Sequence, residues 1–261
     1  MEVKQLEKDF LTFKAENEIF DINCAIPCHL DGTLEDNLPT PEVYFGEGID
    51  KMVLTSSICL RVPYHLGNNI VFETAAKDDR FYASAAIAPD MNLGGRNFAA
   101  ELDEMLAKKT VITRMFPKAH KFQLRKWLVG DVLAELERRR VPLMLWHMQI
   151  EWNELAEIAE AYPNLPIIIE GSDQKTVYYA QSVMGICEKY HNVYLEMHNF
   201  THYDFLPYAL KYIGADRLIF GSRSPFNDMN VPLYQIFTNA DKEQRELILN
   251  GNIKRLISEI K

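Results

Sequence analysis

Short apolar segments of strand character alternate with longer amphipathic segments along almost the whole chain. The strand-like segments lie at residues 20–26, 51–56, 80–89, 111–116, 143–147, 167–170, 193–198 and 217–221. The helical segments lie at residues 2–15, 97–108, 131–140, 153–161, 177–189, 203–213, 241–249 and 253–260, with further helices beginning near residues 40 and 67. Strands that alternate with helices predict βα units and a parallel sheet, and about eight such units close into a barrel. We therefore expect an α/β protein with the (β/α)8 TIM-barrel fold and an extra N-terminal helix.

The length and composition fit one domain of this kind. The chain has 261 residues, of which 48% are hydrophobic and 25% are charged, so it contains enough apolar material for a sizeable core. A single α/β barrel typically has about 250 residues. No linker or low-complexity segment interrupts the alternation. We therefore predict a single domain over residues 1–261, with its functional groups in the loops that follow the strands.

The formal net charge of −9 restricts the classes of partner. Nucleic acids and anionic membranes select a basic surface, so we expect neither as a partner. A small anionic ligand is compatible with this charge, because one local arginine can outweigh the global sign. No apolar run approaches the roughly 20 residues of a membrane span. Residues 1–8 are charged and lack the apolar segment of a signal peptide.

Four cysteines occur in the chain, namely Cys24, Cys28, Cys59 and Cys187. So few cysteines in a chain of this length predict reduced thiols and a cytoplasmic location, and not a disulfide framework. Cys24, Cys28 and His29 form a Cys-x-x-x-Cys-His cluster with two interpretations. It could bind a soft metal or hold a reactive thiol. The spacing is not that of a zinc knuckle and no second cysteine pair follows, so a structural role is the preferred interpretation.

Five segments share their order and spacing with a known family. They lie at residues 79–89, 113–117, 162–170, 216–222 and 248–256. The octapeptide at residues 219–226, Ile-Phe-Gly-Ser-Arg-Ser-Pro-Phe, is similar to a last barrel strand that continues as Gly-Ser-Asp-x-Pro. Together these segments resemble amidohydrolase family 2, a branch of the amidohydrolase superfamily. The resemblance implies a hydrolase, or a decarboxylase-like lyase, that acts on a small carboxylated molecule and forms a homodimer.

The family's metal site is matched poorly. The resemblance implies ligands from a His-x-His motif on strand one, a histidine after strand five, another after strand six, and the aspartate of strand eight. The corresponding positions hold Asn23, Ala25, His147, Gly171 and Arg223. One histidine is not a zinc site, and an arginine can neither ligate a cation nor accept a proton. We therefore expect no metal in the usual position, and a relocated zinc or manganese ion stays an alternative.

His147 and Arg223 are the first candidates for catalysis. His147 ends the fifth strand, where a barrel places catalytic groups, and its near-neutral pKa suits an acid or a base. A histidine that is merely hydrogen-bonded in the mouth is the alternative. Arg223 could hold a carboxylate or phosphate with its planar guanidinium, which we favour, or pair with a buried carboxylate such as Glu196 or Asp21.

His198 completes the predicted catalytic set, and three further residues are predicted to bind substrate. Glu196 and His198 lie two residues apart on the seventh strand and so share a face. Asn23 could orient a ligand by hydrogen bonds, although it is a poor ligand for a transition metal. Arg114 could contact an anion, with a structural ion pair as the more common role of such a residue. Trp146 lies next to His147 and could line a pocket, but it alternates with His147, so packing against the helices is the preferred prediction.

Two classes of function follow. In the first, the chain is a hydrolase or decarboxylase-like enzyme that acts without the usual metal, with His147 as acid or base, Arg223 as the anion-binding residue, and His198 and Asn23 orienting the substrate. In the second, it is a non-catalytic relative that binds a small anionic ligand or has a structural role. A shared fold does not decide between these classes.

Overall fold

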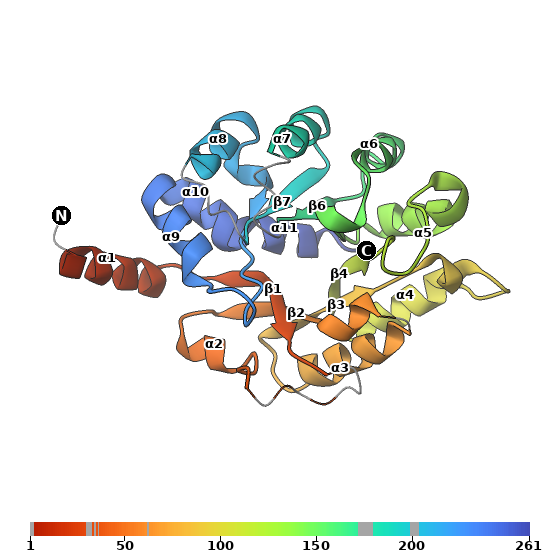
Figure 1. The fold of residues 1–261 in the computed structure, drawn as a ribbon, viewed down its shortest axis with the longest axis horizontal. Helices are drawn as coiled ribbons and strands as arrows, with labels where there is room; N and C mark the ends of the chain where they lie inside the picture. Colours follow the sequence, from red (N-terminus) through yellow and green to blue (C-terminus); the bar gives the residue numbers. More distant parts are fainter. Residues whose placement is uncertain are drawn as a thin grey trace.

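The computed structural model is a barrel of eight parallel strands with helices around it (Figure 1). It describes residues 3–29, 33, 35, 37–61, 63–171, 180–198 and 204–261. The strands are β1 (Phe20–Ile26), β2 (Lys51–Ser56), β3 (Phe81–Ala86), β4 (Thr110–Met115), β5 (Leu143–Trp146), β6 (Ile167–Glu170), β7 (Val193–Glu196) and β8 (Leu218–Ile219). Each strand pairs in parallel with the next one along the chain. The predicted (β/α)8 barrel is confirmed.

The segment that follows β8 closes the barrel onto the first strand through backbone hydrogen bonds. The N–H of Ile22 donates to the carbonyl oxygen of Phe220 at 3.1 Å. Beyond β8, the N–H of Arg223 donates to the carbonyl oxygen of Asn23 at 2.7 Å, and that of Ala25 donates to Ser224 at 2.7 Å. The segment that carries Arg223 is therefore fixed against the end of β1, at the edge where barrels of this class carry their functional groups.

Eleven helices lie outside the strands in the described part of the chain. They are α1 (Val3–Glu16), α2 (Val43–Gly46), α3 (His65–Ala75), α4 (Phe98–Ala107), α5 (Lys126–Arg139), α6 (Trp152–Ala161), α7 (Ala180–Lys189), α8 (Phe205–Tyr212), α9 (Asn230–Asn239), α10 (Lys242–Glu246) and α11 (Asn252–Ser258). The sequence prediction missed α9. Its Pro232 lies in the first turn, where a missing N–H costs no intrahelical bond, and Leu233 and Ile236 are buried.

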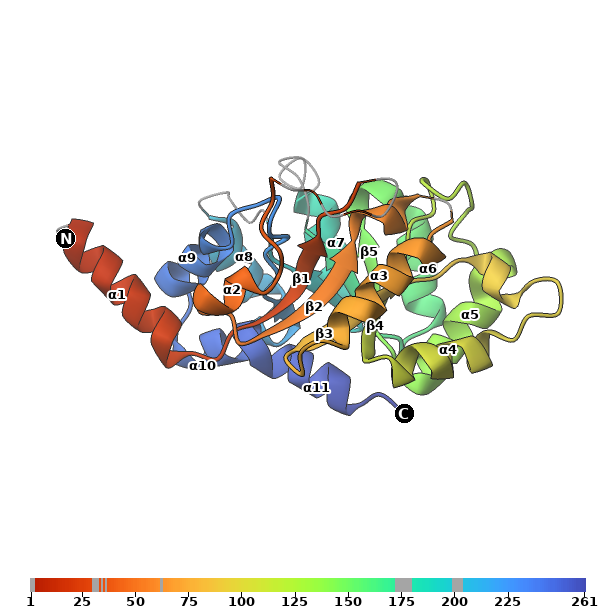
Figure 2. The same cartoon turned by 90° about the horizontal axis from the view of Figure 1, so that it is seen from below.

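The core has two layers, because alternate residues of each strand face opposite sides of the sheet. The larger layer fills the space between the strands and the surrounding helices. The smaller layer fills the barrel interior with Phe20, Ile22, Val53, Ile112, Met144, Ile168, Tyr194 and Ile219. Ile253 and Leu256 of α11 join this inner layer, and Figure 2 shows α11 below the strands. The barrel is thus closed at that end, which leaves the opposite end for a site.

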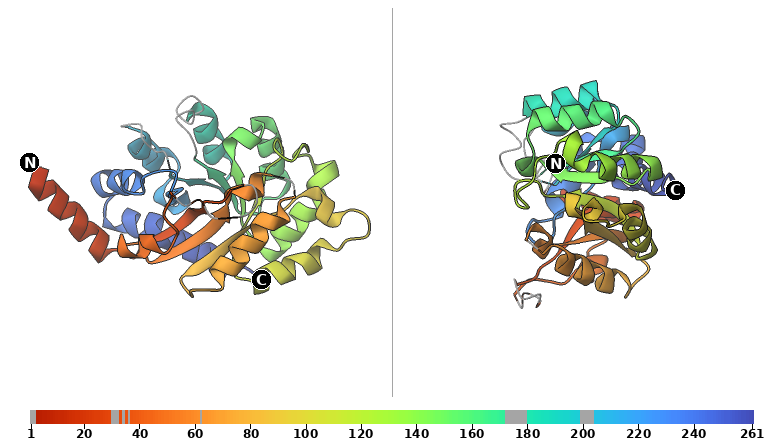
Figure 3. Two further views of the ribbon diagram at one scale, coloured as in Figure 1. Left: turned by 60° about the horizontal axis from the view of Figure 1, so that its bottom comes forward. Right: turned by 90° about the vertical axis from the view of Figure 1, so that its right-hand side faces the viewer.

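Helix α1 projects away from the barrel, and only its C-terminal half packs against the rest of the chain (Figures 2 and 3). Phe10 and Phe13 lie within 5.7 Å and 5.4 Å of the ring of Phe237 on α9. The extra N-terminal helix that the sequence predicts is therefore present. None of the helices in the described segments combines the length and the apolar character that crossing a bilayer would require.

Candidate functional site

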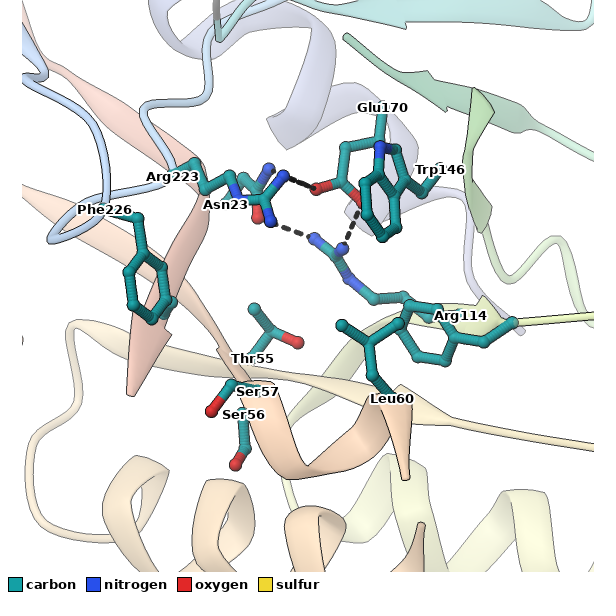
Figure 4. Close-up of a pocket in the computed structure, with 12 residues that line it drawn as sticks. Asn23, Thr55, Ser56, Ser57, Leu60, Arg114, Trp146, Glu170, Arg223 and Phe226 are labelled. Carbon is teal, nitrogen blue, oxygen red and sulfur yellow. Dashed lines mark hydrogen bonds and ion pairs between the residues drawn. The ribbon is translucent and has the colours of Figure 1, made fainter. Parts of the chain in front are cut away.

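A small pocket lies where the carboxyl ends of the strands meet (Figure 4). Its lining residues come from β1, β2, β4, β5 and β6 and from the segments after β2, β4 and β8. They are Asn23, Ala25, Thr55, Ser56, Ser57, Leu60, Arg114, Phe116, Trp146, Glu170, Arg223 and Phe226. The space available inside is about 50 Å³, enough for a group of a few heavy atoms. Asn23, Arg114 and Arg223, which the sequence predicts as site residues, therefore meet in one place.

Arg114 extends from β4 across the barrel mouth, and each nitrogen of its guanidinium donates a hydrogen bond. Its Nη1 donates to Oε2 of Glu170 at 2.7 Å, its Nη2 donates to Oδ1 of Asn23 at 2.9 Å, and its Nε donates to Oγ of Ser84 at 3.0 Å. The residue is only 3% exposed. The structural ion pair that we weighed for Arg114 is therefore present, and this arginine holds β1, β3, β4 and β6 together at the site.

Glu170 is the central carboxylate of the pocket. It accepts from Arg114 and from Nδ2 of Asn23, the latter at 3.2 Å, and Nη1 of Arg223 lies 3.9 Å from its Oε1. Burial alone would raise its pKa, but the positive charges of Arg114, His198 and Arg223 outweigh burial and hold the pKa below the usual value. Glu170 is therefore an ionised carboxylate at neutral pH.

Sequence reasoning did not select Glu170. The prediction placed Gly171 at the family's strand-six position, one residue further along. Glu170 is the last residue of β6 and follows three isoleucines. A charged residue at the end of a buried, apolar strand is unusual, and this was the sequence signal that could have identified Glu170 as a site residue. Gly171 has a different role, because a Cβ there would lie 2.3 Å from the carbonyl oxygen of Glu196.

Arg223 is the more accessible of the two arginines. Its side chain is 27% exposed, its Cζ lies 5.2 Å from the ring centroid of Trp146, and its backbone has a φ of +56°. A positive φ is unfavourable for a residue with a side chain, so the surrounding backbone bonds must hold it. The carboxylate near it is Glu170, and not Glu196 or Asp21 as the alternative proposed. Within the described residues its guanidinium makes no hydrogen bond.

Trp146 lines the pocket, so the prediction that it packs against the helices is wrong. Met144 belongs to the inner layer of the barrel, and Trp146 follows it at the period of two that a strand imposes. His147 comes after β5 ends and does not line the pocket. It is buried, and its Nδ1 lies 3.4 Å from the carbonyl oxygen of Glu170. Its role as an acid or a base stays a prediction.

Glu196 and His198 form a buried pair, as their shared strand face predicted. Nδ1 of His198 lies 2.6 Å from Oε2 of Glu196, and the backbone N–H of His198 donates to Oε1 at 2.9 Å. Nδ2 of Asn23 lies 3.3 Å from the same ring nitrogen. Neither residue lines the pocket, and both are fully buried. Glu196 lies against Gly221, where an added Cβ would be 2.0 Å from its Oε1.

Asp21, on β1, is hydrogen-bonded to the turn that follows β8. Its Oδ1 accepts from the backbone N–H groups of Asn23 and Ser222 at 2.9 Å and 3.0 Å, and its Oδ2 accepts from Oγ of Ser222 at 2.5 Å. Burial raises the pKa of Asp21 to about 6, against the lowering effect of these hydrogen bonds. The geometry of the Gly-Ser segment at the end of β8 therefore depends on a buried carboxylate from β1.

The cluster of Cys24, Cys28 and His29 has no sign of reactive chemistry. Cys24 lies in the outer core layer, opposite to Asn23, as predicted. Burial raises the pKa of Cys24 well above its ordinary value and also raises that of Cys28, so both stay protonated thiols. In the part of the chain that the structure describes, no group of three or more histidine, cysteine or acidic residues is placed to hold a metal ion.

The described residues at the mouth do not offer donors that fit a divalent cation in the family's usual place. Glu170 is the one carboxylate among the described pocket residues, and it is flanked by the guanidinium groups of Arg114 and Arg223. Asn23 already hydrogen-bonds both Arg114 and Glu170. A zinc or manganese ion requires several N, O or S ligands, and two adjacent positive charges oppose its binding.

Comparison with known families settles the membership. The sequence model of the amidohydrolase family matches residues 60–258, most of the chain. The chain belongs to the amidohydrolase family. This confirms the resemblance seen in the sequence segments. A search of curated protein sequences finds no match.

Solved structures of amidohydrolase relatives share the fold. A 2,6-dihydroxybenzoate decarboxylase complexed with 2,6-dihydroxybenzoate is 17% identical, with a TM-score of 0.69 over 93% of this chain and 99% of that one. A dihydroxybenzoic acid decarboxylase from Polaromonas, with bound manganese and the inhibitor 2-nitroresorcinol, is 16% identical, with a TM-score of 0.69 over 93% and 97%. A probable 2-pyrone-4,6-dicarboxylic acid hydrolase from Acinetobacter baumannii, with citric acid bound, is 14% identical, with a TM-score of 0.62 over 92% and 99%. At these identities the likeness concerns the fold alone.

Proposed function

We propose that the barrel mouth binds a small carboxylated molecule and that Arg223 holds its carboxylate. One observation carries this proposal. Arg114 uses its guanidinium on three partners inside the protein, whereas Arg223 reaches the pocket with 27% of its side chain exposed and with Oε1 of Glu170, the nearest carboxylate oxygen among the described residues, 3.9 Å away. Its fork of N–H donors is therefore available, and that fork matches the two oxygens of a carboxylate.

The walls of the pocket favour a compact, partly apolar ligand. Trp146, Phe116 and Phe226 supply aromatic surface, while Thr55 and Ser57 supply hydroxyl groups. The space of about 50 Å³ restricts the buried part of the ligand to a small group such as a carboxylate and its nearest atoms. Two of the similar structures hold carboxylic acids, namely 2,6-dihydroxybenzoate and citric acid. A small aromatic or aliphatic acid is the ligand class that we propose.

We also propose that this site works without a divalent cation in the family's usual position. Arg114 and Arg223 place two positive charges at the Glu170 carboxylate, where a metal ion would add a third. Arginine can supply the electrostatic attraction for an anionic ligand that a metal supplies elsewhere. Elemental analysis of the purified protein tests this point, and stoichiometric zinc or manganese would contradict it.

Hydrolysis is the chemistry that the pocket supports better than decarboxylation. Glu170 is the one carboxylate among the described lining residues, and its lowered pKa keeps it ionised at neutral pH, so it is the group there that can accept a proton, although the same shift makes it a weak base. An acceptor can take a proton from an attacking water, whereas loss of CO2 leaves a carbanion that requires a proton donor. We propose that His147 and His198 act through their neighbours, because His147 contacts the backbone of Glu170 and His198 contacts Asn23.

A non-catalytic anion-binding protein is the second candidate. Its supporting observation is that Glu170 already accepts from Arg114 and Asn23 and has Arg223 nearby, so its capacity to accept a further proton is reduced. The two candidates share the Arg223 binding step. They differ in whether Glu170 turns a bound molecule over.

Calorimetric titration with acetate and benzoate tests the binding step. We expect Arg223→Gln to weaken binding about tenfold or more, the usual value of a charge-assisted contact, and Arg223→Lys to restore part of it. Arg138→Gln, at an exposed arginine on α5, is the matched control and should leave the affinity unchanged. Equal affinities in the wild type and Arg223→Gln would reject the assignment of Arg223.

A panel of small carboxylated amides and lactones then separates the two candidates. An enzyme should turn over at least one of them in the presence of EDTA, and Glu170→Gln should abolish turnover while carboxylate binding remains. A protein that binds acetate or benzoate through Arg223 but turns over no member of the panel would support the non-catalytic candidate.

A further inference from the structure

Most of the polar groups that line the pocket at the barrel mouth are already engaged within the protein. Each nitrogen of the Arg114 guanidinium donates to a protein oxygen, and Glu170 accepts from Arg114 and from Asn23. The amide of Asn23 contacts Arg114, Glu170 and the ring of His198. This wall of the pocket is therefore satisfied before a ligand arrives, and it offers little to one.

The hydroxyl groups on the β2 side of the pocket are not all engaged. Oγ of Ser56 accepts from the backbone N–H of Ile58 at 3.4 Å, and Oγ of Ser57 donates to the carbonyl oxygen of Cys28 at 3.3 Å. The hydroxyl of Thr55 has no hydrogen-bond partner among the described residues, although Thr55 is only 9% exposed. Its oxygen is not among the atoms closed to solvent, so a ligand in the pocket can reach it.

Arg223 is the other accessible group without a hydrogen bond. Its guanidinium donates to none of the described residues, and its contact with Glu170 is an ion pair at 3.9 Å. The indole N–H of Trp146 also lacks a partner in that part of the chain, but it is closed to solvent, so a ligand cannot use it. Among the described lining residues, the pocket thus offers a ligand one guanidinium and one free hydroxyl.

Arg223 and Thr55 are fixed on the two sides of β1. The backbone N–H of Arg223 donates to the carbonyl oxygen of Asn23 at 2.7 Å, and Thr55, on β2, is the register partner of Ala25. In Figure 4, Thr55 lies below Arg223, on the side of the pocket that β2 forms. Because β1 sets the spacing of both segments, the two groups are preorganised to bind one ligand together.

The volume of the pocket restricts where the ligand can carry its second polar group. A space of about 50 Å³ admits a carboxylate and its nearest atoms. A ligand that fills this space displaces water from the Thr55 hydroxyl, and an apolar atom placed there would leave that hydroxyl unpaired, which weakens binding. An oxygen on carbon 2, the carbon bonded to the carboxyl group, satisfies both conditions.

We infer that the pocket selects 2-hydroxy acids over acids that lack the hydroxyl, and that Thr55 hydrogen-bonds the 2-hydroxyl group. This inference rests on the proposed function, because it takes Arg223 as the residue that holds the carboxylate. A hydroxyl is preferred to an oxo group on carbon 2, because the hydroxyl of Thr55 can donate or accept and a ligand hydroxyl complements it in either role. Thr55 is therefore a specificity-determining residue.

Propionate and the two enantiomers of lactate are matched probes, because they differ only in the 2-hydroxyl group and its direction. In calorimetric titrations at pH 7, we expect one enantiomer of lactate to bind about fivefold more tightly than propionate, as one neutral hydrogen bond predicts. The other enantiomer cannot direct its hydroxyl to Thr55 while its carboxylate is on Arg223. It should bind no more tightly than propionate.

Thr55→Val keeps the branched shape of the side chain and removes the hydroxyl. In this variant the three acids should bind with equal affinities, whereas Thr55→Ser should keep the preference for one lactate. Arg223→Gln should weaken the binding of all three acids about tenfold or more. Thr238→Val, at an exposed threonine on α9, is the matched control and should leave the preference unchanged.

The outcomes separate this inference from the proposed function. Binding of propionate that depends on Arg223, without a preference for either lactate, would overturn the inference and leave the proposed function in place. A preference that survives in Thr55→Val would overturn the role of Thr55. If none of the acids binds, or if binding does not depend on Arg223, the proposed function fails and the inference fails with it. Circular dichroism checks the fold of each variant, and Thr55→Ala replaces Thr55→Val if the latter does not fold.

Discussion

Arg114 and Glu170 form a buried ion pair at 2.7 Å that joins β4 to β6 across the barrel mouth. Their side chains are only 4% and 6% exposed. Removing one partner leaves the other charge buried without compensation, which typically costs about 3–5 kcal/mol. We therefore expect Arg114→Met to lower the free energy of unfolding by about 3–5 kcal/mol in urea titrations at pH 7.

The control for this ion pair is an exposed one. Arg138 and Glu135 on α5 are 2.5 Å apart, and the Arg138 side chain is 63% exposed. Arg138→Met should change the stability by less than about 1 kcal/mol, as surface pairs do. The double variant Arg114→Met, Glu170→Leu should lose less stability than the sum of the two single variants, because it leaves no lone charge. Additive losses would contradict the ion-pair explanation.

The buried carboxyl of Asp21 predicts an unusual pH dependence of stability. Its ordinary pKa is 3.8, and burial raises the pKa in the folded protein to about 6. Between these values the folded state binds the proton and the unfolded state does not, so stability falls as the pH rises from about 4 to about 6. The difference between the two pKa values corresponds to about 3 kcal/mol.

Asp21→Asn isolates this effect from other titrating groups. Glu170, with its lowered pKa, contributes in the opposite direction, since its stabilisation is lost as the pH falls. The difference in unfolding free energy between the wild type and Asp21→Asn should therefore depend on pH between 4 and 6 and become constant above about 7. A difference that is constant across the whole range would show that Asp21 titrates normally.

The sequence predicts the barrel well because the alternation of strands and helices is a local property. Each strand is an apolar run with clear ends, and eight such runs leave few other arrangements. The sequence analysis missed helix α9, which contains Pro232. Proline usually interrupts a helix, but Pro232 lies in the first turn, where proline is tolerated. The fold could therefore be predicted from the alternation of strands and helices. The one helix that was missed contains a proline at a position where the usual rule against proline in helices does not apply.

The site was harder to predict because it depends on which residue of a strand end faces inward. Trp146 and Glu170 line the pocket, whereas the sequence analysis favoured His147 as a catalytic residue and aligned Gly171 with the family's strand-six histidine, each one position further along. A shift of one residue reverses the face of a strand. Arg114, Asn23 and Arg223, which the sequence predicts as site residues, line the same pocket, but the Glu170 carboxylate between them depends on contacts between β1, β4 and β6 that no local pattern reveals.

Gly171 and Gly185 give opposite expectations for the same substitution. A Cβ at Gly171 would lie 2.3 Å from the backbone carbonyl oxygen of Glu196, which cannot move without disturbing β7. We expect Gly171→Ala to destabilise the protein by about 1–3 kcal/mol, as overpacking does. A Cβ at Gly185, on α7, meets nothing within 4 Å, so Gly185→Ala should stabilise the helix by about 0.5–1 kcal/mol. Urea unfolding measures both, and a stable Gly171→Ala would mean that β6 and β7 are not so closely packed.

Trp146 provides a test of how the carboxylate-binding arginine is held. The Cζ of Arg223 lies 5.2 Å from its ring centroid, a cation–π contact that keeps the guanidinium over the pocket. Such a contact contributes about 0.5–1 kcal/mol at a partly exposed site, so Trp146→Leu should weaken benzoate binding about two- to fivefold. Trp146→Phe should retain part of the affinity, because phenylalanine keeps an aromatic face. Trp127→Leu, at a tryptophan that is 76% exposed on α5, is the control for loss of an indole elsewhere. An unchanged dissociation constant in Trp146→Leu would show that the backbone bonds around Arg223 position its guanidinium without help from the ring.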